Sequence, residues 1–197
     1  MSDIQLSCEC GQVKGVATNI TPDNGNHVVC CCCDCQAFAH HLDKQDSTLD
    51  EFGGTRLYQT SQSQVKITKG ADKIACLRLT PKGLTRWYTS CCNTPLGNTL
   101  NAKMPLIGII NSFIQEDSDT AEALGPVLAY CQTQYASKLP SNQPHHAKFP
   151  LGITLRIISK ILGWKIRGMG KPSAFYNDQN KSVAKPKVVS EQKSGNL

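Results

Sequence analysis

The sequence predicts a mainly β domain of short antiparallel strands, followed by a partly helical C-terminal extension. Short segments rich in β-branched and aromatic residues recur along the first 113 residues, with Gly, Pro, Asn and Asp between them. A long amphipathic helical pattern occurs beyond residue 150. We therefore expect a zinc-binding β domain over residues 1–113, an extension with helices packed on it over 114–176, and a disordered tail over 177–197.

The predicted strands lie close together in the sequence and are separated by turn signals. They cover residues 4–8, 12–17, 27–32, 55–60, 65–68, 76–79, 85–89, 96–100 and 107–113. Helical turns are predicted over 34–42 and 127–139, whereas 115–124 is acidic and polar. In 151–167, an apolar face formed by Leu151, Leu155, Ile158 and Leu162 predicts an amphipathic helix packed on the β domain. The alternative for this basic helix is binding to a membrane surface or to nucleic acid.

Five cysteines in six consecutive positions are the chemical centre of the sequence. In an extended backbone alternate side chains share a face, so Cys30 and Cys32 point one way, and Cys35 can turn back beside them. Three convergent thiolates leave the fourth position of a tetrahedral ion open, which is typical of a reactive zinc. A redox or iron–sulfur cluster, or a closed zinc site completed by Cys31 or Cys33, is the alternative.

A second set of cysteines predicts a closed, structural metal site. Cys8 and Cys10 flank a turn in which Gly11 suits a positive φ. Cys91 and Cys92 follow the predicted strand 85–89 and can complete the site from far along the chain. Four cysteine ligands would contribute binding free energy to the fold. The alternative is that one of the two adjacent cysteines is an ordinary buried thiol.

The remaining cysteines and histidines carry weaker signals. Cys76 and Cys131 are isolated in apolar surroundings, which predicts buried thiols without a chemical role. His40 and His41 follow the central cysteines and are the candidate catalytic residues, because imidazole transfers protons near neutral pH. The alternative for this pair is a polar helix end.

The net charge of +6 is unevenly distributed, with −3 over residues 1–137 and +9 over residues 138–197. The N-terminus has no basic segment followed by an apolar one, and no run of about 18 apolar residues exists, so neither export nor a transmembrane segment is expected. In a cytoplasmic, reducing setting, clustered cysteines indicate metal ligands, here one or two Zn²⁺ per chain. The sequence gives no signal for an oligomeric state.

From about residue 6 to 100 the chain resembles an uncharacterised bacterial branch of the glutathione-dependent formaldehyde-activating family, which includes centromere protein V-like proteins. The resemblance rests on Cys8-Glu-Cys10-Gly11-x-Val13, Cys30-x-Cys32-x-Asp34-Cys35, Gly53-Gly54 and Cys92-Asn93-Thr94-Pro95-Leu96. It implies an all-β, tent-like fold with two zinc ions. It also implies a catalytic zinc on Cys30, Cys32 and Cys35, and a structural zinc that includes Cys8, Cys10 and Cys92.

The sequence departs from this pattern at the late motif. The family has Cys-x-x-Cys-Gly where this chain has Thr89-Ser90-Cys91-Cys92-Asn93. Thr89 stands at the position of the first cysteine, and Cys91 is the candidate to replace it.

A zinc held by three thiolates carries a net charge of −1 and suits binding of a substrate thiol as thiolate. The resemblance therefore implies a carbon–sulfur lyase-type enzyme acting on a glutathione-like thiol and a small aldehyde. The alternative is a non-catalytic, zinc-stabilised module that binds a partner, nucleic acid included, through its basic C-terminal third.

Overall fold

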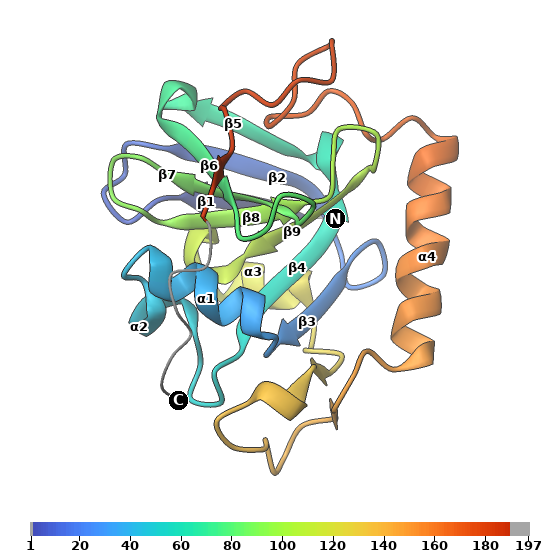
Figure 1. Ribbon diagram of the computed structural model, residues 1–197. Helices are drawn as coiled ribbons and strands as arrows, with labels where there is room; N and C mark the ends of the chain where they lie inside the picture. Colours follow the sequence, from blue (N-terminus) through green and yellow to red (C-terminus); the bar gives the residue numbers. More distant parts are fainter. Residues whose placement is uncertain (1, 190–197) are drawn as a thin grey trace.

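The computed structural model describes residues 2–189 and confirms a mainly β fold with helices (Figure 1). A small antiparallel sheet has the order β1 (Ser2–Ser7), β2 (Lys14–Ile20) and β5 (Val65–Lys69). The large sheet has the order β11 (His145–His146), β10 (Tyr130–Cys131), β3 (Asn26–Cys30), β4 (Thr55–Ser61), β9 (Leu106–Ile110), β8 (Pro95–Thr99), β7 (Thr85–Thr89), β6 (Ile74–Arg78) and β12 (Lys187–Val188).

Helices connect and cover these strands. The α-helices are α1 (Cys33–His41), α2 (Gln45–Thr48), α3 (Ser118–Leu124) and α4 (Leu151–Ile166). Short 3₁₀ helices are η1 (Gln62–Gln64), η2 (Ala71–Lys73), η3 (Asn111–Phe113) and η4 (Thr133–Tyr135).

The central strands of the large sheet, from β3 to β6, pair antiparallel, as the sequence predicts. Both edges are extended by short parallel strands from the C-terminal part of the chain. On one side β10 pairs with β3, and on the other β12 pairs with β6. The segment after residue 113 therefore continues the sheet instead of only lying on it.

Two apolar cores lie on opposite faces of the large sheet. Because neighbouring strand residues point to opposite faces, Tyr58 and Cys76 belong to one core while Leu57 and Leu77 belong to the other. The first core also contains residues of β1, β2 and β5, so the small sheet covers that face. The second contains Phe38, so α1 covers the other face (Figure 1).

One prediction about the segment after residue 113 is wrong, and one helix lies where none was predicted. Residues 127–139 form β10 and η4 instead of a helix, because their backbone completes the edge of the sheet at β3. The acidic segment 115–124 contains α3, whose N-cap Asp117 accepts a hydrogen bond from the Thr120 amide at 2.7 Å.

Helix α4 forms as predicted, but the prediction that its leucine-rich face packs on the β domain is wrong. Leu151, Leu155, Ile158 and Leu162 are exposed, and Trp164 is the buried residue of the helix. The helix stands along one side of the molecule (Figure 1). No helix between residues 2 and 189 combines the length and hydropathy that a bilayer-spanning segment requires.

The sequence predicts a disordered tail from Asn177, whereas in the described part of it, residues 177–189, the chain forms a hydrogen-bonded turn and then pairs with β6 at the edge of the large sheet. The Val183 amide donates to the Phe175 carbonyl at 3.0 Å, and the Val189 amide donates to the Arg78 carbonyl at 2.9 Å. Polar composition does not reveal such pairing, because it uses backbone groups at an open strand edge. Residues 190–197 lie outside the described part of the chain.

Candidate metal centres

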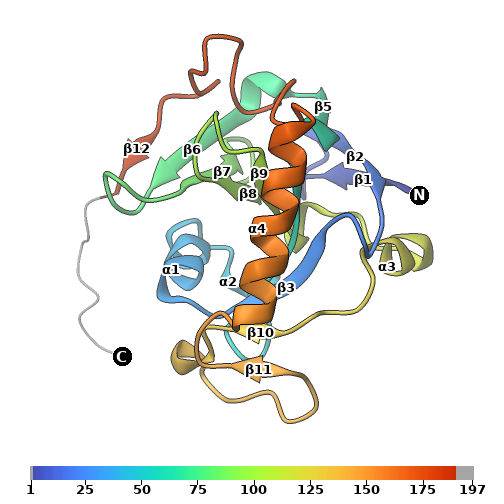
Figure 2. The ribbon, with the colours of Figure 1, turned by 90° about the vertical axis from the view of Figure 1, so that its right-hand side faces the viewer.

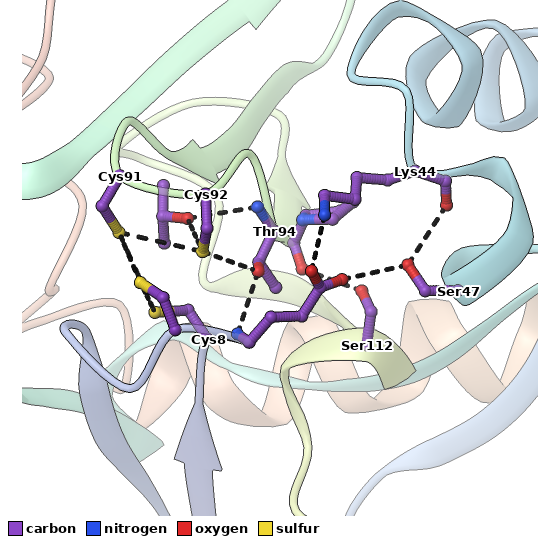
Figure 3. A network of polar contacts seen from close by, with 11 residues as sticks. Cys8, Lys44, Ser47, Cys91, Cys92, Thr94 and Ser112 are labelled. Carbon is purple, nitrogen blue, oxygen red and sulfur yellow. Dashed lines mark hydrogen bonds and ion pairs between the residues drawn. The ribbon is translucent and has the colours of Figure 1, made fainter.

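The four-cysteine group joins two turns that are far apart in the sequence. Cys8 and Cys10 belong to the β1–β2 turn, and Cys91 and Cys92 to the β7–β8 turn (Figure 3). All four Sγ atoms lie within 4.8 Å of one another. Four of the six Sγ–Sγ distances run from 3.4 Å to 3.9 Å. Sulfurs around a tetrahedral zinc lie about 3.8 Å apart, given Zn–S bonds of about 2.3 Å, so the group fits a closed site.

The β1–β2 turn brings its two thiols together through backbone hydrogen bonds. The Gly11 amide donates to the Cys8 carbonyl at 2.9 Å, and Gly11 adopts the predicted positive φ, +70°. The Val13 amide donates to the Cys8 Sγ at 3.2 Å. Burial raises the pKa of Cys8, and the Val13 amide directed at its sulfur opposes this shift by stabilising thiolate.

In the β7–β8 turn, two hydroxyl groups contact the sulfur of Cys92. Thr89 Oγ1 and Thr94 Oγ1 lie 3.3 Å and 3.1 Å from the Cys92 Sγ. Burial raises the pKa of Cys92, but these hydrogen bonds, together with those from the backbone of Cys10 and Thr94, outweigh it and lower the pKa to about 5. Asn93 has a φ of +56°, where the resembled family has glycine. In the resembled family the position of Thr89 holds a cysteine. Here the Thr89 hydroxyl contacts the Cys92 sulfur instead, and Cys91 provides the fourth sulfur of the group.

Glu9 connects this group to the segment that follows α1. Its amide donates to Thr94 Oγ1 at 3.1 Å, and its carboxylate binds Lys44 Nζ at 2.5 Å and Ser47 Oγ at 3.1 Å (Figure 3). The ion pair is partly exposed and contributes little by itself, about 1 kcal/mol or less. Its structural effect is to hold the end of α1 and α2 beside the first hairpin.

The three-cysteine group lies where β3 ends and α1 begins. Cys30 is the last residue of β3, Cys32 is the N-cap of α1, and Cys35 lies in its first turn. Their Sγ atoms lie within 4.8 Å of one another, and Cys30 and Cys35 are buried. The positive end of the helix dipole and its free amides favour thiolate at this position.

The three thiols act electrostatically as one unit. Hydrogen bonds from Cys30 and Cys35 hold the pKa of Cys32 far below its usual range, and the Arg86 guanidinium lowers it further. Donation toward Cys32 and burial raise the pKa of Cys30. A metal ion bound here would displace the protons that the three sulfurs share through their hydrogen bonds.

The neighbouring cysteines point elsewhere, as the alternation of strand side chains predicts. Cys31 is fully buried, and its amide donates to the Cys131 carbonyl at 3.0 Å, while Cys33 is exposed. Within residues 2–189, no other Cys, His, Asp or Glu belongs to the three-cysteine group. Cys76 and Cys131 are buried outside both groups, as predicted.

Arg86 is the residue that sequence reasoning misses. Its side chain is 2% exposed, and it reaches the three-cysteine group from β7. Nη1 lies 3.9 Å from the Cys35 Sγ, Nη2 lies 3.3 Å from Asp34 Oδ2, and the guanidinium stacks over Phe38 at 5.6 Å. The sequence signal that could have revealed Arg86 is the alternation of side chains along a strand. Trp87 lies in the core on one face of the large sheet, so the neighbouring Arg86 lies on the opposite face, where a buried guanidinium needs a polar or negatively charged partner.

His40 and His41, the predicted catalytic residues, are exposed at the C-terminal end of α1. They lie five and six positions after Cys35. Because a helix places residues three and four positions apart on one face, neither histidine shares a helix face with Cys35. Neither histidine belongs to either cysteine group. Their part in proton transfer stays a prediction.

Comparisons with known proteins give a family and distant structural similarity. The model of a family described as "Family of unknown function (DUF6151)" matches residues 1–186. No curated protein sequence matches the chain. A crystal structure of a Rhodobacter sphaeroides protein, a structural genomics target, matches with 13% identity and a TM-score of 0.44, covering 63% of this chain and 97% of that one. Neither match names the glutathione-dependent formaldehyde-activating family.

Proposed function

The chain belongs to DUF6151, a family of unknown function, and we propose that it is a zinc protein that binds a small thiol at its three-cysteine group. The difference between the two cysteine groups supports this proposal most directly. One group offers four sulfurs and is complete, whereas the other offers three and stands beside a buried cation. Sites with three protein ligands are reactive, whereas sites with four are structural.

The donor chemistry favours zinc. Both groups consist of thiols alone, and soft thiolate donors select zinc or iron–sulfur clusters over magnesium or calcium. Bound by Cys30, Cys32 and Cys35, Zn²⁺ would supply a fourth coordination position for a substrate thiolate. The charge of Arg86 offsets the −1 that three thiolates and one dication leave, so a further anion is admitted more easily.

The reaction that we propose is the reversible addition of the thiol to a small aldehyde. The sulfur–carbon bond forms as the carbonyl π bond opens, and the proton lost by the thiol ends on the new hydroxyl oxygen. The reverse reaction cleaves the same bond, which makes the activity carbon–sulfur lyase-like. His40 and His41 are the proposed proton carriers between the site and solvent, because their exposure allows exchange with water.

The test is a rate measurement on zinc-loaded protein with glutathione and formaldehyde, followed by NMR exchange spectroscopy. We expect the wild type to accelerate adduct formation and Cys32→Ala to lose the acceleration. Cys33→Ala is the matched control, because it removes an exposed thiol that lies one residue further on and outside the group. Equal loss in both variants, or no acceleration by the wild type, would overturn the proposal.

A further inference from the structure

Helix α4 exposes a continuous apolar stripe along its whole length. The exposed fractions are 72% for Leu151, 56% for Leu155, 47% for Ile158, 55% for Leu162 and 86% for Ile166. Spacings of three and four residues place these side chains on one face of the helix. Large exposed apolar areas on a folded protein mark interaction surfaces.

The opposite face of α4 is held firmly to the body of the protein. Arg156 Nε donates to Asn26 Oδ1 at 2.8 Å, and its Nη2 donates to the Pro22 carbonyl at 2.9 Å. Lys160 donates to the Asp23 carbonyl, and Trp164 is 2% exposed. These contacts fix the rotation of the helix, so the leucine-rich face is turned outward by specific bonds.

The surroundings of the stripe are positively charged. Residues 123–177 contain seven Lys and Arg and no Asp or Glu. Lys148 and Lys171 are exposed beyond the two ends of α4, and Lys165 and Arg167 are exposed near its C-terminal end. Cations therefore border the apolar side chains, and no acidic side chain in this segment opposes an anionic partner.

We propose that α4 docks the protein on an anionic lipid surface, with the apolar stripe inserted at the boundary between headgroups and acyl chains. Helices that lie in a membrane interface combine apolar side chains on one face with flanking Lys and Arg. Each cation near an anionic leaflet adds to the electrostatic attraction. Figure 2 shows α4 across the outer side of the molecule, in a position to meet a flat surface.

The charge distribution favours a lipid surface over a second copy of the chain or nucleic acid as the partner of α4. Pairing α4 with α4 of a second copy would bring like charges together, because the helix itself carries three cations and no acidic residue. Nucleic acid would need those cations, but Arg156 and Lys160 are turned inward onto backbone carbonyls. The exposed apolar side chains have no role in such a contact.

The test is flotation of the full-length, zinc-loaded protein with vesicles of equal parts phosphatidylglycerol and phosphatidylcholine, against vesicles of phosphatidylcholine alone. We expect binding to the anionic vesicles that weakens with salt. The double variant Leu155→Gln/Leu162→Gln should bind at least about tenfold more weakly, because a tenfold loss corresponds to about 1.4 kcal/mol and the burial of even one leucine supplies that much. Lys165→Gln/Arg167→Gln should also weaken binding, with a smaller dependence on salt.

The matched control is Leu139→Gln, which removes another exposed leucine, 61% exposed and outside the helix, and should bind like the wild type. A single Leu155→Trp reports insertion directly, through a blue shift of its fluorescence on anionic vesicles. Absence of wild-type binding to anionic vesicles would overturn the proposal. So would self-association that Leu155→Gln/Leu162→Gln abolishes without any vesicle binding, or nucleic-acid binding that the same variant retains.

Discussion

The guanidinium of Arg86 lies against the sulfur of Cys35, with Nη1 3.9 Å from Sγ, although one residue comes from β7 and the other from α1. Both side chains are buried between the sheet and the helix. A permanently charged group in this position offsets the excess negative charge of three thiolates. The fold thus supplies an electrostatic partner to a group of ligands that come from one short segment.

Replacing Arg86 with methionine should weaken zinc and thiol binding at the three-cysteine group without unfolding the protein. Methionine fills similar space, and exchanging a buried charged group for an apolar one is often neutral for stability when no buried charge is left unpaired. Asp34 is 58% exposed and can return to water. Zinc competition and glutathione titration measure the effect. Arg86→Lys is the control. Its affinities for zinc and glutathione should lie between those of the wild type and Arg86→Met, because lysine keeps the charge but loses the two parallel N–H donors of the guanidinium. Unchanged affinities in Arg86→Met would contradict this role.

Cys91→Ser should reduce stability more than Cys35→Ser, although each variant should lose one zinc ion. The four-cysteine group links the β1–β2 turn to the β7–β8 turn, so its metal stabilises a long-range contact. We expect a fall of about 3 kcal/mol or more in the free energy of unfolding for Cys91→Ser. Thermal melts and elemental analysis of both variants check this. Equal destabilisation would argue against the distinction between a structural and a reactive group.

Truncation after Tyr176 should lower the free energy of unfolding by about 1–3 kcal/mol, because it removes several backbone hydrogen bonds at the β6 edge. Denaturant titration measures the loss. The matched pair Val189→Pro and Val189→Ala isolates one bond, since only proline removes the amide that donates to the Arg78 carbonyl. A truncated protein as stable as the full chain would show that this strand contributes nothing.

His27 should make the protein less stable below about pH 6.5, near its ordinary pKa. Burial lowers the pKa of His27, so the unfolded chain takes up a proton that the folded one resists, and stability falls as pH decreases. The charged groups facing it are Arg56 and Glu116, which line the same surface hollow of about 410 Å³.

His27→Asn tests this because asparagine can still donate to the Gly125 carbonyl, which lies 2.7 Å from Nδ1. We expect the wild type to lose more stability than the variant between about pH 7 and about pH 5. Loss of zinc at low pH affects both proteins equally and cancels in the difference. Identical pH profiles would mean that His27 is not the titrating group.

The strands of the first 113 residues and both cysteine groups could be predicted from the sequence because their signals are local. Cys30, Cys32 and Cys35 converge within one turn, and Gly11 marks a tight turn by its need for a positive φ. The approach of Cys8 and Cys10 to Cys91 and Cys92 could also be predicted, because two cysteines alone cannot complete a four-coordinate metal site.

What the sequence could not reveal depends on contacts between distant elements. Helix α4 has apolar residues on two faces, and the bonds from Arg156 and Lys160 to the loop around Asp23 decide which face turns inward. Burial of Arg86 depends on α1 lying over β7. Residues 127–139 become edge strand and turn because β3 offers an unpaired edge. None of these partners lies near in the sequence.

The measurement that most directly tests the central claim uses cobalt in place of zinc, because its visible bands report coordination. The claim is that the three-cysteine group keeps a position free for an exogenous thiol. Titration of cobalt-loaded wild type with glutathione should shift the ligand-field bands, and Cys32→Ala should show little or no shift, while Cys33→Ala responds like the wild type. A spectrum of closed four-sulfur sites before titration, unchanged by glutathione, would contradict the claim and make both cysteine groups structural.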